Sequence, residues 1–313
     1  MKTLLVLLAV AASATAQDFP TKPIRLVVPN PAGGTVDIVA RVAAQQLTAA
    51  LGQNAIVEIK PGGNNVIGSE IVARAPADGH TVLMIGNHFV INPLVRKLPY
   101  DGMRAFTPIA GLAATPLAFA VNPAVPARSL QELVAYSKSK PGLNYASSTT
   151  GSGIHLAGEM FKSLAGIDLN TVPYQGGVQA AMAVAGGHAD VLVAPLSDAA
   201  PHLASGRLRV LAVSSPQRVD LAKDIPTVAE SGYPGFQAQS WFGAVAPAGT
   251  PQAVVNRLAA EMLRAVEKPE VKATFAKLGI VPLPMGPREF GAFMRAEQDA
   301  FAKIIKDGNI RPE

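Results

Sequence analysis

The sequence of 313 residues predicts an α/β fold in which parallel β-strands alternate with helices. Short apolar runs rich in β-branched residues end in turns that contain glycine, and helical patterns of apolar residues follow these turns. The clearest example is the run 24–28, which leads through a turn ending at Gly34 into a helical pattern that stops at Gly52. Strands alternating with helices at this spacing indicate a parallel sheet. The length exceeds one average domain and suits two.

The N-terminus has the pattern of a secretory signal peptide. Lys2 precedes an uninterrupted apolar run from Leu4 to Ala12, and Ala14-Thr15-Ala16 is a small-residue cleavage motif. The apolar run is too short to span a membrane, and no later run in the sequence reaches spanning length. We therefore expect residues 1–16 to be removed after Ala16 and the mature chain to be exported to the periplasm.

Further elements follow in order along the first half of the chain. We expect strands at 55–60, 81–85, 117–121 and 143–147, and helices at 67–75 and 129–140. The helix after residue 128 has a capping box, in which Ser129 is the N-cap and Glu132 lies at the third helical position. The intervening residues 93–116 are expected to be rich in loops.

The second half continues the same alternation. We expect strands at 191–194, 208–213 and 241–246, and helices at 154–164, 178–185, from Pro251 and from Pro287. Thr250 is the expected N-cap before Pro251. Aromatic residues at helical spacing after Pro287 indicate core packing, whereas Trp241, the only tryptophan, either borders a ligand cleft or packs in the core.

Composition excludes several classes of function. The chain has no cysteine, so disulfides, thiolate metal sites and cysteine nucleophiles are absent. The formal charge of +5 falls to +4 (5 − 1) once Lys2 is cleaved away, and the basic residues are scattered with only 5% aromatics, which argues against nucleic-acid binding. The histidines show no metal-ligand spacing and no P-loop is present, so neither a metal nor a cofactor is expected.

The turn before the first helix is a candidate anion site. The first N–H groups of a helix lack partners within the helix, and a glycine lets a ligand approach the backbone there. An ordinary strand-to-helix turn that binds nothing has the same pattern. Asn30 and Asn87 lie just past the carboxyl ends of two expected strands, where ligands bind on parallel sheets, although asparagine is also a common turn former there.

Two later junctions repeat this pattern. The segment 148–153 places four hydroxyl residues around two glycines before a helix, and hydroxyls together with free N–H groups suit a carboxylate. His155, just inside that helix, is expected to support the loop. At the next junction, Tyr174 either offers its hydroxyl to a ligand or packs at a strand end. Asp198 follows the strand 191–194 and either holds an ammonium group or water, or caps a helix.

An ordered set of motifs runs through nearly the whole mature chain and resembles the substrate-binding proteins of tripartite tricarboxylate transporters, also called Bug-type receptors. These motifs are PIRLVVP at 23–29, PAGG at 31–34, LGQ at 51–53, PG at 61–62, ADG at 77–79, LPYD at 98–101, HLAGE at 155–159, VPYQG at 172–176, GRLR at 206–209, IPT at 225–227 and APAGTP at 246–251, together with Asp37 and Arg41.

The resemblance implies a two-lobed periplasmic-binding-protein (Venus-flytrap) fold. Each lobe is expected to hold a mainly parallel sheet flanked by helices, and the chain is expected to cross between the lobes twice. Lobe 1 would comprise residues 17–121 and 239–313, and lobe 2 residues 122–238. The protein would close on an organic carboxylate, namely a di- or tricarboxylate, an acidic amino acid or an aromatic acid such as a phthalate. It would deliver this ligand, as a monomer, to membrane permease subunits.

The resemblance also implies the ligand contacts. By position, the loops that hold the carboxylate through main-chain N–H groups and hydroxyls contribute Ala32, Gly33, Gly34 and Thr35 from lobe 1 and Thr149, Thr150, Gly151 and Ser152 from lobe 2.

The sequence departs from the family pattern at two places. Asn30 stands where the family often has an aromatic residue, and Asn64 and Asn65 replace glycines. Both departures bear on the shape and polarity of the pocket. Asp37, in the first turn of its helix, is expected to cap that helix or to orient a water molecule.

Two other functions remain open from the sequence. A secreted α/β enzyme could use the same cleft on a carboxylated substrate, although no paired carboxylates can be placed together. A receptor of the same fold could instead signal to a sensor kinase. Turnover of a bound acid would indicate the enzyme, and neighbouring genes would separate a transporter from a kinase.

Overall fold

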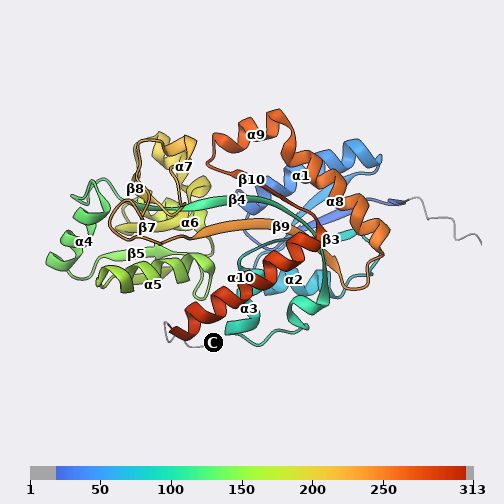
Figure 1. Cartoon of the computed structure of the whole chain (residues 1–313), viewed down its shortest axis with the longest axis horizontal. Coiled ribbons are helices and arrows are strands. Elements are labelled where there is room, and N and C mark those ends of the chain that lie inside the picture. The colour runs from blue at the N-terminus through green and yellow to red at the C-terminus, as the bar shows by residue number, and fades with distance from the viewer. Residues whose placement is uncertain (1–18, 308–313) are drawn as a thin grey trace, which may run out of the picture.

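Two mixed β-sheets that share one long strand organise the computed structural model of the protein (Figure 1). The structure describes residues 19–307, so the expected signal peptide lies outside the described residues. The first sheet contains β2 (Ala55–Ile59), β1 (Ile24–Val28), β3 (Thr81–Gly86), β9 (Gln239–Pro247), β4 (Phe106–Val121) and β10 (Val281–Met285). The second contains β4, β7 (Val191–Pro195), β5 (Asn144–Ser147), β6 (Asn170–Pro173) and β8 (Arg209–Val213).

The α/β fold is confirmed, but each sheet is mixed rather than mainly parallel. Strands β2, β1 and β3 are parallel to one another, as are β6, β5 and β7. The remaining pairings are antiparallel. Strand β9 pairs antiparallel with β3, and β4 pairs antiparallel with β9 and β10 in the first sheet and with β7 and β8 in the second. The antiparallel strands connect the sheets, because β4 and β9 run side by side between the two halves in Figure 1.

Helices cover both faces of each sheet. They are α1 (Thr35–Leu51), α2 (Val66–Ala73), α3 (His88–Val95), α4 (Leu130–Ser139), α5 (Gly153–Ala165), α6 (Gly177–Ala185), α7 (Leu196–Ala204), α8 (Gln252–Glu267), α9 (Pro269–Ala276) and α10 (Pro287–Asp307), with short 3-10 helices η1 (Gly102–Ala105) and η2 (Asp220–Ala222). In the first sheet, α1 and α8 pack on one face and α3 and α10 on the other. In the second, α4 and α5 lie opposite α6 and α7. The apolar faces of both sheets are thus buried.

The expectation of loops over residues 93–116 is wrong. Helix α3 includes Pro93, and β4 begins at Phe106. The first part of this strand is rich in Ala, Gly and Pro, which are depleted in strands, so its sequence carries little β signal. The strand accommodates Pro108 where its register against β9 shifts, a position where proline is tolerated. Burial against neighbours on both edges and both faces overrides the weak local preference.

The lobe boundaries stay a prediction. Residues 106–116 of β4 pair with β9, whereas residues 117–121 pair with β7 and β8 of the second sheet. On strand pairing, the first crossing therefore lies near residue 116, a few residues before the predicted boundary.

Several local predictions can be compared with the structure. The capping box is present in part, since Ser129 Oγ accepts from the N–H of Glu132 at 3.1 Å, but the Glu132 carboxylate accepts from the N–H of Arg128 at 2.7 Å. The predicted Thr250 cap is wrong by one residue. Helix α8 begins at Gln252 after Pro251, and the Thr250 hydroxyl donates to the Pro247 carbonyl at 2.7 Å.

Trp241 lies in the core and not at a cleft. Its side chain is fully buried and its ring packs edge-on against Phe290 and Phe293, with centroid distances of 5.7 and 5.4 Å. Its indole N–H donates to Glu297 Oε2 at 2.8 Å. Because side chains alternate along a strand, its neighbours Ser240 and Phe242 point to the opposite face of β9.

Candidate functional site

A narrow cavity lies between the two sheets, at the carboxyl ends of their parallel strands. Its water-accessible volume is about 60 Å³, room for a few water molecules. The first sheet and its helices contribute Asn30, Pro31, Gly34, Thr35, Val36, Gly86, Asn87, His88, Ser240 and Phe242, and the second Ser148, Gly153, Ile154, Gly176, Gly177, Val178, Gln179, Pro195 and Asp198. No Lys or Arg lines the cavity within the described residues 19–307.

Helices α1, α5 and α6 all begin at this cavity. The N-caps of α1 and α6 are Gly34 and Gly176, and neither provides a side chain to cap the first N–H groups. In α5 the Ser152 hydroxyl accepts from the N–H of His155, so this helix start is capped. The backbone N–H of Thr35 at the start of α1 donates to Asp198. The other first N–H groups of α1 and α6 receive no cap from the N-cap side chains, so both helix starts direct N–H groups and partial positive charge to the cavity, which suits an anion such as a carboxylate.

The structure brings together only some of the predicted contact residues. Those that line the cavity are Asn30, Gly34, Thr35, Asn87 and Asp198. Those that lie outside the lining are Ala32, Gly33, Thr149, Thr150, Gly151, Ser152 and Tyr174. The role of each residue in ligand binding stays a prediction.

Local hydrogen bonds explain why several predicted donors are engaged elsewhere. The N–H of Gly33 donates to Asp37 Oδ2 at 2.9 Å, so the Asp37 carboxylate closes the turn before α1 and is itself paired with Arg41 at 2.8 Å. Ser152 is fully buried and caps α5. Tyr174 is half-buried and packs against the apolar cluster beneath α6 and α7. The sequence pattern identified the turns but not which of their atoms face the cavity.

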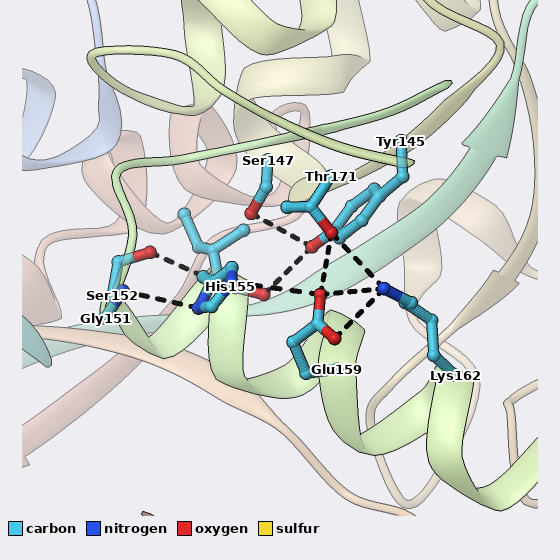
Figure 2. A network of polar contacts seen from close by, with 9 residues as sticks. Tyr145, Ser147, Gly151, Ser152, His155, Glu159, Lys162 and Thr171 are labelled. Carbon is cyan, nitrogen blue, oxygen red and sulfur yellow. Dashed lines mark hydrogen bonds and ion pairs between the residues drawn. The ribbon is translucent and has the colours of Figure 1, made fainter. Parts of the chain in front are cut away.

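A polar network on α5 holds the loop 148–152 (Figure 2). His155 Nδ1 accepts from the N–H of Gly151 at 3.3 Å, as expected for a residue that supports this loop. One turn later, Glu159 accepts from Thr171 at 2.8 Å and pairs with Lys162 at 3.0 Å. This network fastens the loop and the start of α5 to strand β6, away from the cavity itself.

Asn87 lines the cavity, but both ends of its side-chain amide hold strand β9. Its Nδ2 donates to the Gln239 carbonyl at 3.1 Å, and its Oδ1 accepts from the N–H of Trp241 at 3.2 Å. These bonds fix Ser240, which lies between the two contacted residues, at the cavity wall. Asn87 thus acts in the structure as a support for the lining.

The two departures from the family pattern contact each other. Asn65 Nδ2 donates to Asn30 Oδ1 at 3.2 Å. Asn64 and Asn65 adopt positive φ angles of 51° and 73°, a region that favours glycine and that asparagine tolerates better than most residues. The asparagines therefore preserve the turn that glycines would form and add a side-chain hydrogen bond that orients Asn30.

Two ionisable side chains line the cavity, and burial shifts both. Burial raises the pKa of Asp198 to about 6, although hydrogen bonds from Thr35 oppose the shift. Burial, together with the positive charge of Arg96, lowers the pKa of His88 to about 4. At neutral pH the cavity therefore contains a neutral imidazole and a carboxylate that is still mostly ionised, although burial makes its charged form less favourable than in water.

Thr35 connects the two halves of the protein at the cavity. Its hydroxyl donates to Asp198 Oδ1 at 3.0 Å and lies 2.5 Å from the Ser197 hydroxyl. Thr35 begins α1, whereas Ser197 and Asp198 belong to α7 on the second sheet. Asp198 lies within the first turn of α7 and is not its N-cap, because the helix begins at Leu196.

Sequence reasoning missed several lining residues. The junction at Gly176 and Gly177 carried a visible signal, because it repeats the strand, glycine turn and helix of the first site. Gln179 follows in the same helix and His88 starts α3, but neither has a sequence context that marks a ligand contact. Ser240 comes from a strand far along the chain, and only the pairing of β9 with β3 brings it to the cavity.

Residues 19–307 contain no cluster of His, Asp or Glu side chains arranged to hold a metal ion. Over the same range, no helix has both the length and the apolar character needed to cross a membrane.

Comparison with known sequences identifies relatives over most of the chain. The family model described as the tripartite tricarboxylate transporter family receptor matches residues 39–310. A protein of Pseudomonas sp. strain P51, from the tcbD-tcbE intergenic region, is 33% identical over 92% of this chain and 86% of its own length. Protein BugT of Bordetella pertussis is 32% identical over 95% of this chain and 93% of its own length.

Solved structures share the fold. R. palustris Rpa4515 with adipate has a TM-score of 0.91 and 30% identity, covering 95% of this chain and 100% of that one. Periplasmic binding protein BugD has a TM-score of 0.89 and 30% identity, with 94% and 100% covered. MatC from Rhodopseudomonas palustris, with bound malate, has a TM-score of 0.84 and 29% identity, with 92% and 100% covered. The chain therefore belongs to the family of tripartite tricarboxylate transporter receptors.

Proposed function

We propose that this protein is a periplasmic solute receptor that captures an organic carboxylate between its two lobes and delivers it to the membrane permease of a tripartite tricarboxylate-type transporter. The observation that carries the proposal is the cavity where α1 and α6 both begin, each after an N-cap glycine that has no side chain to occupy the space in front of the helix. Main-chain N–H groups and helix dipoles can hold a carboxylate there without a Lys or Arg in the lining. The solved relatives with adipate and malate support a carboxylate ligand.

Ligand-driven closure of the lobes is the proposed mechanism. The cavity is lined from both sheets, so a carboxylate bound at α1 and α6 would contact both lobes at once only when they are closed. A ligand that contacts both lobes binds the closed form more tightly and shifts the population toward it. The hydrogen bonds from Thr35 to Ser197 and Asp198 further stabilise the closed form. The closed lobes would then present a surface that the permease recognises.

We further propose that the protein acts by binding and not by catalysis. Of its histidines, His155 is engaged by the loop N–H of Gly151, and His88 is neutral and buried against the cavity. Receptors of this family bind solutes. Absence of turnover of a bound acid would support this part of the proposal, and turnover would contradict it.

A thermal-shift screen of the mature protein against carboxylic acids tests the proposal. The panel contains dicarboxylates, tricarboxylates, acidic amino acids and aromatic acids, each with its amide as a matched control. A ligand present at about a hundred times its Kd adds roughly 2.7 kcal/mol to the free energy of unfolding, which raises the melting temperature measurably. We expect a stabilising acid whose amide has no effect. If amides stabilise as well as acids do, the carboxylate site is wrong.

A further inference from the structure

Two hydrogen-bond acceptors flank the start of α6 in the cavity. Gln179 Oε1 is buried and has no hydrogen-bond partner. It lies beside Gly176, where an added Cβ would come within 3.2 Å of it. The carboxylate of Asp198 lies beside the next residue, because a Cβ on Gly177 would come 2.3 Å from Asp198 Oδ2. Both side chains line the same cavity, and Gly176 and Gly177 leave room for them.

One of these acceptors, Gln179 Oε1, requires a donor that residues 19–307 do not supply. A buried acceptor without a partner is costly, and native proteins rarely leave one unsatisfied. The Thr35 hydroxyl donates to Asp198 Oδ1, and no side-chain donor reaches Gln179 Oε1 within residues 19–307. An ionised carboxylate has only acceptors, so an unsubstituted dicarboxylate cannot donate to Gln179 Oε1 and is repelled by the Asp198 carboxylate.

We propose that the ligand carries a hydrogen-bond donor, a hydroxyl or an ammonium group, next to its carboxylate, and that Gln179 and Asp198 select for this donor. The inference rests on the proposed carboxylate-binding function and narrows it to hydroxy acids and amino acids. The N–H groups at the start of α6 hold the carboxylate, while the neighbouring donor falls between Gln179 and Asp198. An ammonium has several N–H donors and a positive charge, so it can satisfy Gln179 Oε1 and offset the Asp198 charge together, whereas a hydroxyl has one proton and donates to one of the two acceptors.

Calorimetric titration of the mature protein with succinate, malate and aspartate tests the inference, because these acids share a four-carbon dicarboxylate and differ in one substituent. We expect malate, aspartate or both to bind at least about tenfold more tightly than succinate, the effect of leaving one buried polar group unpaired. A preference for malate identifies the donor as a hydroxyl, and a preference for aspartate identifies it as an ammonium.

Two variants assign the preference to the named side chains. Gln179→Met removes the orphan acceptor at similar size and should bring the affinity of malate close to that of succinate. Asp198→Asn removes the charge and should reduce the preference for aspartate. The same chemical changes on exposed residues outside the cavity, Gln252→Met and Asp220→Asn, should leave every affinity unchanged.

The outcomes separate this inference from the proposed function. If succinate binds as tightly as malate and aspartate do, the inference is wrong, but the proposed carboxylate-binding function still holds. A substituent preference that survives unchanged in Gln179→Met and in Asp198→Asn also contradicts it, because the selection would then come from other groups. If none of the three acids binds, but an acid without a hydroxyl or ammonium group does, the assignment to hydroxy acids and amino acids fails. If no acid binds at all, both proposals fail.

Discussion

At the scale of single residues, Asp198 and His88 give the cavity two opposite dependences on pH. The folded-state pKa of Asp198, about 6, is raised from its ordinary value of 3.8, so the folded chain holds an extra proton between these values. Its contribution to the free energy of unfolding therefore decreases as pH rises from about 4 to 6. The folded-state pKa of His88 is lowered from 6.5 to about 4, so its contribution increases as pH rises from 4 to 6.5.

The two dependences oppose each other in the wild type, and single variants should reveal them. Relative to the wild type, we expect the unfolding free energy of Asp198→Asn to increase between pH 4 and 6 by about 1–2 kcal/mol, a value reduced from the full shift because the side chain keeps some solvent contact. His88→Gln should show the opposite trend relative to the wild type between pH 4 and 6.5. Urea denaturation at half-unit pH steps measures both. Parallel curves for wild type and variants would contradict the assignment of these shifts.

Gly34 tests the anion site at the start of α1. Its φ of −79° suits any residue, and the nearest atoms to an added Cβ are Pro31 O at 3.8 Å and Val178 Cγ2 at 4.0 Å. Alanine therefore fits, whereas the larger side chain of Gly34→Leu would fill the space between α1 and α6. We expect Gly34→Leu to weaken binding of the acid found in the screen by tenfold or more, which corresponds to about 1.4 kcal/mol. Its melting temperature without ligand should stay close to that of wild type.

Gly34→Ala is the matched control for this experiment. Its Cβ makes only an ordinary van der Waals contact with Val178 at 4.0 Å, so the acid should bind with nearly wild-type affinity. Normal binding by Gly34→Leu would mean that the ligand does not occupy the space in front of α1.

At the scale of elements, α5 packs so closely on β5 that one helix position excludes a side chain. A Cβ on Gly158 would lie 2.0 Å from the Tyr145 hydroxyl, which itself donates within a buried network to Ser147 at 3.0 Å (Figure 2). The Tyr145 ring is fully buried and cannot move aside without disturbing Phe119 and Phe161 in the same cluster. The contact between this helix and this strand depends on the glycine.

We expect Gly158→Ala to lower the free energy of unfolding by about 1–3 kcal/mol despite the higher helix propensity of alanine, because overpacking outweighs that gain. Gly286→Ala is the control, since no atom lies within 4 Å of a Cβ at that position. Chemical denaturation of the two variants should show a clear loss only for the first. Equal stabilities would contradict the packing described here.

At the scale of the whole molecule, the Thr35 hydroxyl is a direct contact between elements of the two sheets. Thr35→Val removes its bonds to Ser197 and Asp198 at nearly constant volume. Each lost hydrogen bond costs about 1 kcal/mol, which shifts an equilibrium between closed and open lobes about fivefold toward the open form. We expect a larger radius of gyration in small-angle X-ray scattering without ligand, and a smaller difference from wild type when ligand is bound.

Thr171→Val is the control for the opening experiment. The Thr171 hydroxyl bonds to Glu159 and Lys162, all of which lie on the second sheet and its helix α5. Its removal should leave the radius of gyration unchanged. If Thr35→Val scatters like wild type under all conditions, the hydroxyl does not contribute to closure.

Much of the architecture follows from local patterns in the sequence. The glycine turns, the β-branched strands and helix ends such as Gly52 are set by neighbours a few residues apart, so they could be predicted. The same holds for the support of the loop by His155, which acts on Gly151 one turn away. The first part of β4 could not be predicted, because its small residues form a strand only through burial against β9 and β10.

The sequence by itself determined the α/β class and the turns that surround the site, because hydrophobic periodicity and glycine geometry act locally. Only the tertiary structure decided which atoms of those turns face the cavity. Thr35 meets Asp198, 163 residues away, and Ser240 reaches the wall through strand pairing. Such contacts depend on how the two sheets pack together, and the energy of that packing is spread over many residues that no local motif records.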